Sequence, residues 1–259
     1  MEGSIILTKQ NGIASITLNR PDKFNAFNRE MALAMQEALD NSATDDAIRC
    51  VVITGNGKAF SAGQDIAELV GDNAISMEKI LSEHYNPIVT RMRKMPKPVV
   101  CAVNGVAAGA GANIALCGDI VVAAKSATFI QAFSKIGLIP DSGGTYFLPR
   151  LVGFAKASAL MMLAEKVPAD DALQMGMIYK VLNDEEFAEG VQNIAKTLAD
   201  MPTTALAKIK QALSLSFENN LIEQLDVEDR LQRECAATDD YREGITSFLE
   251  KRSPKFSGK

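Results

Sequence analysis

Residues 98 to 124 form a long, nearly uncharged stretch in which Asp119 is the only charged side chain. A run of this length and apolarity resembles a membrane span. However, asparagines at positions 104 and 113 and several glycines interrupt it, and its pattern changes midway. The stretch therefore predicts two buried strands joined by a glycine-rich turn and a helix, and we do not expect a membrane protein.

The composition is that of an ordinary globular chain. It has 259 residues, of which 47% are hydrophobic and 23% charged, enough for one large domain with or without a small appendage. The formal net charge of -5 offers no overall basic field, so we expect neither nucleic acid nor an anionic membrane as a partner. The N-terminal "MEGSIILTKQ" lacks the features of a signal peptide, and we expect a cytoplasmic protein.

Histidine and cysteine usage excludes several classes of site. His84 is the only histidine and no CxxC pair occurs, so no metal site and no histidine-based nucleophilic site is predicted. We expect His84 on a helix surface. Cys50, Cys101 and Cys117 lie in apolar runs, which predicts buried free thiols.

Local patterns predict an α/β fold followed by helices. Asn11-Gly12 suits the tight turn of a hairpin over residues 4–20, and Asn28 is the expected N-cap of a helix. "CVVITG", "PVVCAVNG", "DIVVAA" and "ATFIQAF" read as strands. After Pro149 the chain turns helical, and four apolar residues keep helical spacing near its end: Leu206, Ile209, Leu213 and Leu221.

Two segments of small residues follow predicted strands. In "VNGVAAGAGANIAL" (103–116) a helix is expected to start between Gly109 and Ala112, where the first amides have no helical acceptor and the dipole is positive. "KAFSAGQDI" (58–66) is similar. Two N–H groups from two such loops would form an oxyanion hole. On composition alone, close packing of small residues is the favoured interpretation of each segment.

Four segments change that balance: "LNRPDKFNAFN", "AFSAGQDI", "AVNGVAAGAGANIAL" and "IGLIPDSGGTYFLPR". In this order they resemble the crotonase (enoyl-CoA hydratase/isomerase) superfamily. More narrowly, "IQAFSKIGLIPDSGGT" and the C-terminal "DYREGITSFLEKRSPKFSGK" are similar to the 1,2-epoxyphenylacetyl-CoA isomerases of phenylacetate degradation. The resemblance implies a spiral of β-β-α units over residues 1–195 and a helical region over 196–259. It also implies that these helices form a homotrimer, or a hexamer built as a dimer of trimers.

The resemblance also implies a site for an acyl-CoA substrate. The amides of Ala62 and Ala110 would hold the thioester oxygen, with alanine at 110 where the family usually has glycine. CoA is part of the substrate, and no separate cofactor is expected. The residues implied to border the substrate are Lys23, Asn25, Ala26, Gly63, Gln64, Asp65, Ile66, Gly109, Asn113 and Phe133.

Two departures from the family pattern bear on the reaction. Hydratases of the family use two glutamates, and this chain has Asn113 and Phe133 at those positions, neither of which exchanges a proton. Asp141 follows Pro140 where some isomerases of the family have an acid, and a single carboxylate can both remove and return a proton. By itself "IPDSGG" is typical of a turn in which the aspartate bonds its own backbone. Both interpretations can hold together.

The predicted function is therefore an acyl-CoA isomerase that uses one carboxylate. It would convert 3-enoyl-CoA to 2-enoyl-CoA, 1,2-epoxyphenylacetyl-CoA to oxepin-CoA, or both. The alternatives are a 2-enoyl-CoA hydratase with a different acid and a non-catalytic acyl-CoA-binding protein. The basic run "RMRKMPK" (91–97) is expected on a solvated helix face, and Asp239-Asp240 at a helix start and on the surface.

Overall fold

Two β-sheets form the centre of the molecule in the computed structural model, which describes residues 3–71 and 74–259. The larger sheet has the order β1 (Ile5–Gln10), β2 (Ile13–Leu18), β3 (Cys50–Gly55), β5 (Val99–Val103), β7 (Ile120–Ala124) and β10 (Lys180–Leu182). The smaller has the order β4 (Ala59–Ser61), β6 (Val106–Ala108), β8 (Thr128–Ile130) and β9 (Lys166–Pro168). Neighbouring strands are parallel except in the β1/β2 and β8/β9 pairs.

Successive units of the chain build both sheets together. β3, β5 and β7 lie in the larger sheet, while the strand after each of them, β4, β6 and β8, lies in the smaller one. Helices return the chain between units, which is the expected spiral of β-β-α units. The helices are α1 (Arg29–Thr44), α2 (Met77–Lys79), α3 (Asn86–Lys94), α4 (Ala110–Leu116), α5 (Gly144–Val152), α6 (Phe154–Leu163), α7 (Ala169–Gln174), α8 (Phe187–Asp200), α9 (Thr203–Leu215), α10 (Leu221–Ala236) and α11 (Asp239–Glu250).

Local sequence signals place the first elements as predicted. Asn11 and Gly12 have φ values of 52° and 76°, the left-handed conformation that a two-residue hairpin turn requires. The side chain of Asn28 accepts a hydrogen bond from the amide of Met31 and so caps α1. Both sequence predictions are confirmed.

Alternate residues of the larger sheet pack into two separate hydrophobic clusters. Side chains such as Val51 and Val99 pack on one face with α1 and α3, where the smaller sheet also packs. Their neighbours in sequence, such as Val52 and Val100, pack on the other face against Val191 and other residues of α8. This two-sided burial explains why β3, β5 and β7 read as continuous apolar runs.

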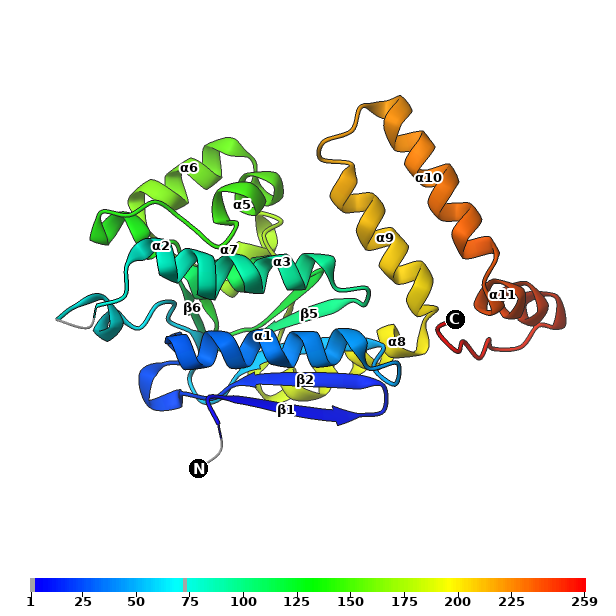
Figure 1. Ribbon diagram of the computed structural model, residues 1–259, viewed down its shortest axis with the longest axis horizontal. Coiled ribbons are helices and arrows are strands. Elements are labelled where there is room, and N and C mark those ends of the chain that lie inside the picture. The colour runs from blue at the N-terminus through cyan, green and yellow to red at the C-terminus, as the bar shows by residue number, and fades with distance from the viewer. Residues whose placement is uncertain (1–2, 72–73) are drawn as a thin grey trace.

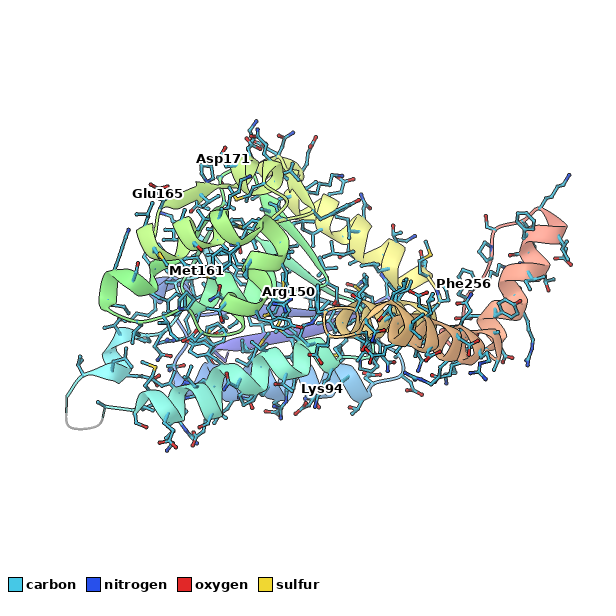
Figure 2. The ribbon with its side chains drawn as sticks, turned by 90° about the horizontal axis from the view of Figure 1, so that it is seen from above. Lys94, Arg150, Met161, Glu165, Asp171 and Phe256 are labelled. Atoms are coloured by element: carbon cyan, nitrogen blue, oxygen red, sulfur yellow. The ribbon has the colours of Figure 1, made fainter. Side chains whose placement is uncertain are left out.

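The C-terminal helices α9, α10 and α11 project from the α/β core (Figures 1 and 2). The boundary expected near residue 195 falls inside α8, whose residues Val191, Ala195 and Ala199 are buried against the sheet. A division after Asp200 therefore follows the packing better. Of the predicted helical stripe, Ile209 and Leu213 are exposed in this chain, so the periodicity marks a face that the chain itself does not bury.

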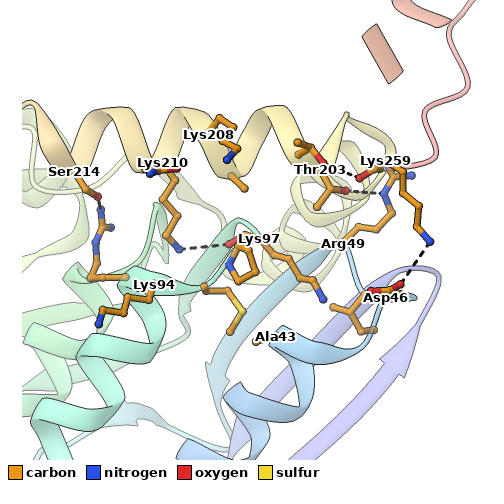
Figure 3. A pocket seen from close by; sticks show the side chains of 18 of the residues that line it. Ala43, Asp46, Arg49, Lys94, Lys97, Thr203, Lys208, Lys210, Ser214 and Lys259 are labelled. Carbon is orange, nitrogen blue, oxygen red and sulfur yellow. Dashed lines mark hydrogen bonds and ion pairs between the residues drawn. The ribbon is translucent and has the colours of Figure 1, made fainter. Parts of the chain in front are cut away.

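Polar contacts fasten α9 and the C-terminal segment to the core (Figure 3). Lys210 of α9 forms a largely buried ion pair with Asp119 at 2.7 Å. Arg49 donates hydrogen bonds to Thr203 and to the carbonyl oxygen of Phe256. Charged groups therefore contribute to the orientation of α9.

The sequence predicted Lys97 and Asp240 at the surface, and both predictions are wrong because backbone groups pair with these charged side chains inside the fold. Lys97 is buried, not solvated, and its ammonium donates to the carbonyl oxygens of Ser42 and Asp45 at the end of α1. Asp240 is also buried, and its carboxylate accepts from the backbone amides of Ser257 and Gly258. In both places a charged side chain is paired with backbone groups, which offsets the cost of burying it.

The stretch from 98 to 124 comprises β5, β6, α4 and β7. Across residues 3–71 and 74–259, no helix is long and apolar enough to cross a membrane. Cys50, Cys101 and Cys117 are buried free thiols, as predicted. The expectation for His84 is wrong: the residue lies in a π-helical segment over residues 80–85 and is fully buried.

Candidate functional site

The candidate site forms where three parallel strands of the smaller sheet end. Because β4, β6 and β8 are parallel neighbours, the segments that follow them emerge at one edge of that sheet. These segments begin at Ala62, Gly109 and Gln131. Two of them are the small-residue segments of the sequence, so the topology brings together loops that are far apart along the chain. Ligands of α/β proteins commonly bind at such an edge.

A cavity of about 430 Å³ opens at this edge. Its lining includes ten of the residues expected from the sequence: Lys23, Ala26, Ala62, Gln64, Asp65, Ile66, Gly109, Ala110, Phe133 and Asp141. The remaining lining residues were not predicted: Leu69, Met77, Ile80, Tyr85, Ala132, Ile136 and Leu138. Most of these are apolar residues whose pattern in the sequence does not differ from that of core residues.

The backbone amides at the cavity differ from the prediction in one respect. Ala62 is not an available donor, because its N–H already donates to the carbonyl oxygen of Phe24 at 2.9 Å. Gln64 and Ala110 line the same cavity, and their backbone amides have no acceptor among the residues that the structure describes. Gln64, and not Ala62, is therefore the candidate donor to pair with Ala110.

Gly63 allows these two segments to approach each other. A Cβ atom built at Gly63 would lie 2.9 Å from the carbonyl oxygen of Ala108 and 3.2 Å from the amide nitrogen of Ala110. Gly63 also has φ 89°, a conformation that other residues rarely adopt. Only glycine fits at position 63. The backbone next to Gln64 can therefore lie close to the start of α4. Gly63 itself does not line the cavity.

Two carboxylates line the cavity, and their environments differ. Asp65 forms an ion pair with Arg20 at 2.8 Å. Partial burial of Asp65 raises the pKa of its carboxyl group, but Arg20 and the amide of Ala67 outweigh this effect and hold the pKa below its usual value. Asp141 has no cationic partner within the described part of the chain. Burial raises its pKa, and a hydrogen bond from the Ser142 hydroxyl at 2.8 Å opposes this only in part. Asp141 is therefore the better proton acceptor of the two.

A buried phenol extends the polar part of the cavity. Tyr85 is 1% exposed, and its hydroxyl donates to the side-chain oxygen of Gln64 at 2.9 Å. The amide nitrogen of the same Gln64 side chain donates to Glu68 at 2.9 Å. Burial raises the pKa of the Tyr85 phenol, and the negative charges of Asp141 and Glu68 add to the effect. The phenol is therefore neutral over the ordinary pH range.

Besides Gly63, two residues expected to border the substrate, Asn25 and Asn113, do not line the cavity. The side chain of Asn25 is buried and donates to the carbonyl oxygens of Asn56 and Ala59, so it supports the loop and not the ligand. Asn113 is also fully buried, and its amide nitrogen donates to the backbone carbonyl of Asp141 at 2.8 Å. Phe133 does line the cavity; its ring tip lies 3.9 Å from a Cβ atom built at Gly109.

A larger cavity of about 750 Å³ lies elsewhere, between α3, α9 and the C-terminal segment (Figure 3). It contains none of the predicted site residues. Several of its basic groups, among them Arg49, Lys97 and Lys210, already bind carbonyl or carboxylate oxygens. In the described ranges, no group of three or more His, Cys, Asp or Glu residues could hold a metal ion. The cavity beside Asp141 therefore remains the candidate site.

Comparison with known proteins finds relatives that match nearly the whole chain. A family model described as "Enoyl-CoA hydratase/isomerase" matches residues 8–259. The chain is 49% identical to the 1,2-epoxyphenylacetyl-CoA isomerase of Escherichia coli over 96% of this chain and 97% of that protein. It is 36% identical to the crotonyl-CoA hydratase of Syntrophomonas wolfei over 99% and 98% of the two chains. A crystal structure of an enoyl-CoA hydratase from Polaromonas sp. JS666 superposes with a TM-score of 0.92 at 34% identity, covering 98% of this chain and 100% of that one.

Proposed function

Because the chain belongs to the enoyl-CoA hydratase/isomerase family, we propose that it is an acyl-CoA isomerase in which Asp141 acts as the single proton carrier. The observation that carries this proposal is the contrast within the cavity. One carboxylate is neutralised by Arg20, while Asp141 has a raised pKa and shares the cavity with two free backbone amides. An enzyme that moves one proton along a thioester needs this combination.

In the proposed reaction the thioester oxygen accepts hydrogen bonds from the amides of Gln64 and Ala110. Asp141 removes a proton from C2 of a 3-enoyl-CoA, and the electron pair of the C–H bond moves toward the thioester oxygen. The resulting dienolate is stabilised by the two amides, each contributing about 3 kcal/mol. Protonated Asp141 then returns the proton to C4, and the double bond lies between C2 and C3. No atom is gained or lost.

Water addition is less compatible with the site. It needs a second group that exchanges a proton, and position 113 holds an amide whose nitrogen is already bound to the Asp141 carbonyl. Position 133 holds a phenylalanine that lines the cavity. The buried Tyr85 phenol has a pKa well above its usual value, which makes it a poor acid at neutral pH. Isomerisation needs none of these groups to ionise.

For the acyl group, we propose 1,2-epoxyphenylacetyl-CoA as a substrate beside simple enoyl-CoA thioesters. This proposal is supported by the 49% identity to the E. coli protein of that name. The cavity also presents two aromatic side chains, Phe133 and Tyr85, beside an apolar wall that includes Met77 and Leu138. An aromatic ring fits such a wall by area and by ring–ring contact.

We further propose that the chain works in the cytoplasm as a trimer or a dimer of trimers. The projecting C-terminal helices support the assembly, because they leave large apolar side chains uncovered in the single chain. These include Ile209, Leu213, Leu221, Ile222, Phe248 and Leu249. Exposed apolar patches of this kind are typical of surfaces that another copy covers.

The experiment that tests the reaction is incubation with 3-hexenoyl-CoA and, separately, 2-hexenoyl-CoA in deuterated water. Liquid chromatography with mass spectrometry separates isomers from 3-hydroxyacyl-CoA and counts incorporated deuterium. We expect interconversion of the isomers and little hydrated product. A 3-hydroxyacyl-CoA as the main product would identify a hydratase and refute the one-carboxylate mechanism. Binding of acyl-CoA without turnover, for these substrates and the aromatic epoxide, would identify a binding protein.

A further inference from the structure

Two buried side-chain amides link the smaller sheet to the loop that carries Asp141. Gln131, directly after β8, donates from its amide nitrogen to the side-chain oxygen of Asn113 on α4 at 2.8 Å. Asn113 in turn donates from its own amide nitrogen to the backbone carbonyl of Asp141 at 2.8 Å. Both side chains are at least 95% buried, with exposures of 5% and 0%.

The orientation of both amides is fixed by the last acceptor. A backbone carbonyl only accepts, so Asn113 must present its NH₂ group to Asp141. The oxygen of Asn113 then faces Gln131, which must present its own NH₂ group. The hydrogen-bond chain therefore has a single direction, and it ends on the residue proposed to carry the proton.

The loop that receives this hydrogen bond has a conformation that needs support. Ser142 has φ 51° and Gly143 has φ 76°, so two consecutive residues are left-handed and one of them is not glycine. A non-glycine residue in this conformation costs about 1 kcal/mol or more and persists only where its surroundings hold it. The carbonyl of Asp141 accepts from both Asn113 and the amide of Gly144, each at 2.8 Å.

The same Asn113 side chain also packs closely against this loop. A Cβ atom built at Gly144 would lie 2.2 Å from the amide nitrogen of Asn113, so the amide of Asn113 packs directly against the backbone there. A side chain at 144 would therefore collide with Asn113. An ionised carboxylate at position 113 would face the Asp141 carbonyl without a proton to donate.

From this geometry we infer that Asn113 and Gln131 are positioning residues for proton transfer: together they form an amide clamp that holds the carboxylate of Asp141 at the substrate. The inference rests on the proposed function and extends it to residues that do not touch the substrate. It also gives position 113 a role other than the substrate contact expected from the sequence. Losing the clamp should displace the carboxylate by a fraction of an ångström to an ångström, which lowers kcat by about 10- to 100-fold.

The test uses Asn113→Asp, which keeps the shape of the side chain and makes its donor depend on pH. An ionised aspartate cannot donate to the Asp141 carbonyl, whereas a protonated one can. Burial raises the pKa of such a group, so the proton is regained as pH falls. The quantity measured is the ratio of kcat for Asn113→Asp to kcat for wild type from pH 5 to 9.

Besides Asp141, the nearby Cys117 thiol and Tyr85 phenol are titratable, and neither ionises in this pH range. Burial raises the pKa of the Cys117 thiol to about 12, although Arg93 acts in the opposite direction, and burial likewise raises that of the Tyr85 phenol. We expect the ratio to be about 0.01 to 0.1 at high pH and to rise toward 1 as pH falls. KM and the affinity for the acyl-CoA product should change little.

Two further variants separate the clamp from simple packing. Asn113→Leu has the same number and branching of side-chain heavy atoms and no donor, so its ratio should be low at every pH. Gln131→Glu makes the first donor of the chain pH-dependent and should show the same rise with a smaller amplitude. If one variant fails to fold, as judged by circular dichroism, the other still carries the test.

The outcomes discriminate clearly. A ratio that is constant across pH for both acidic variants, or wild-type kcat in Asn113→Leu, would refute the clamp. If the wild-type enzyme isomerises its substrate in deuterated water and the variants give either of these results, only the clamp is refuted. If wild type itself shows neither isomerisation nor exchange at C2, the proposed function fails instead, and the two results cannot be confused.

Discussion

Replacing Asp141 with asparagine should separate activity from stability. Asparagine keeps the size of the side chain, and its oxygen can still accept the hydrogen bond from Ser142 that Asp141 accepts at 2.8 Å. The loop is therefore expected to keep its shape. What is lost is the group that takes up and returns a proton, which typically contributes a factor of about 10² to 10⁴. At about 1.36 kcal/mol per tenfold change, this is roughly 2.7 to 5.4 kcal/mol of transition-state stabilisation.

The effect on stability has the opposite direction. Because burial raises the pKa of Asp141 above 3.8, the folded protein binds that proton more tightly than the unfolded chain does. Ionising Asp141 therefore costs stability as pH rises from the unfolded pKa through the folded one, and the cost is complete once the pH is above the folded pKa. Asp141→Asn avoids this cost. We expect its unfolding temperature at pH 7 to equal or exceed that of wild type, with the difference disappearing in acid.

The assay combines steady-state isomerisation of 3-hexenoyl-CoA with thermal unfolding of the same preparations. Wild-type kcat should also fall as pH drops through the raised pKa of Asp141, because only the carboxylate accepts a proton. Retention of more than about a tenth of wild-type kcat in Asp141→Asn would refute the proposed role, since it lies outside the range for loss of a proton carrier. A large loss of stability at pH 7 would instead contradict the buried, unpaired environment described for this carboxylate.

Three further perturbations test other parts of the structure. Ala110→Pro removes the amide proposed as a donor, at the first position of α4, where proline is tolerated. We expect kcat to fall about 10²- to 10³-fold while the circular dichroism spectrum is unchanged. Normal turnover would exclude this amide as a donor. Gly63→Ala places a methyl group 2.9 Å from the carbonyl oxygen of Ala108, at a residue with a left-handed conformation. We expect the free energy of unfolding in urea to fall by about 1 to 3 kcal/mol and activity to be lost. A fully active variant would show that the close approach of the Gly63 backbone to Ala108 is dispensable. Phe248→Asp introduces a charge on an exposed apolar face of α11 and should lower the molar mass measured by light scattering, whereas an unchanged mass would place the subunit contacts elsewhere.

Much of the fold follows from local patterns in the sequence. The Asn11-Gly12 turn, the Asn28 cap and the apolar runs of β3, β5 and β7 each depend on residues next to one another in the chain. Such signals are sufficient because turn conformations, caps and strand burial are decided by short-range sterics and by the period of the apolar pattern. The two small-residue segments and Asp141 were assigned to the site through their resemblance to the enoyl-CoA hydratase/isomerase family, because their residue types alone favour close packing and a turn.

Long-range hydrogen bonding decided the details of the candidate site. The choice between Ala62 and Gln64 as the available amide depends on Phe24, whose carbonyl reaches Ala62 from another part of the chain. Asn113 turns away from the cavity because the Asp141 carbonyl lies within its reach. No periodicity in the sequence encodes which donor meets which acceptor across such distances.

Burial of polar side chains was decided in the same way. Lys97 and Asp240 look like surface residues in the sequence, because charged side chains are usually solvated. They are buried in the structure because a helix end and the C-terminal segment supply backbone partners for them. The sequence by itself thus determined the strands, turns, caps and the chemical groups of the site. Only the tertiary structure determined which of those groups are free to act, since a donor or a charge is available only when no other part of the fold has already paired with it.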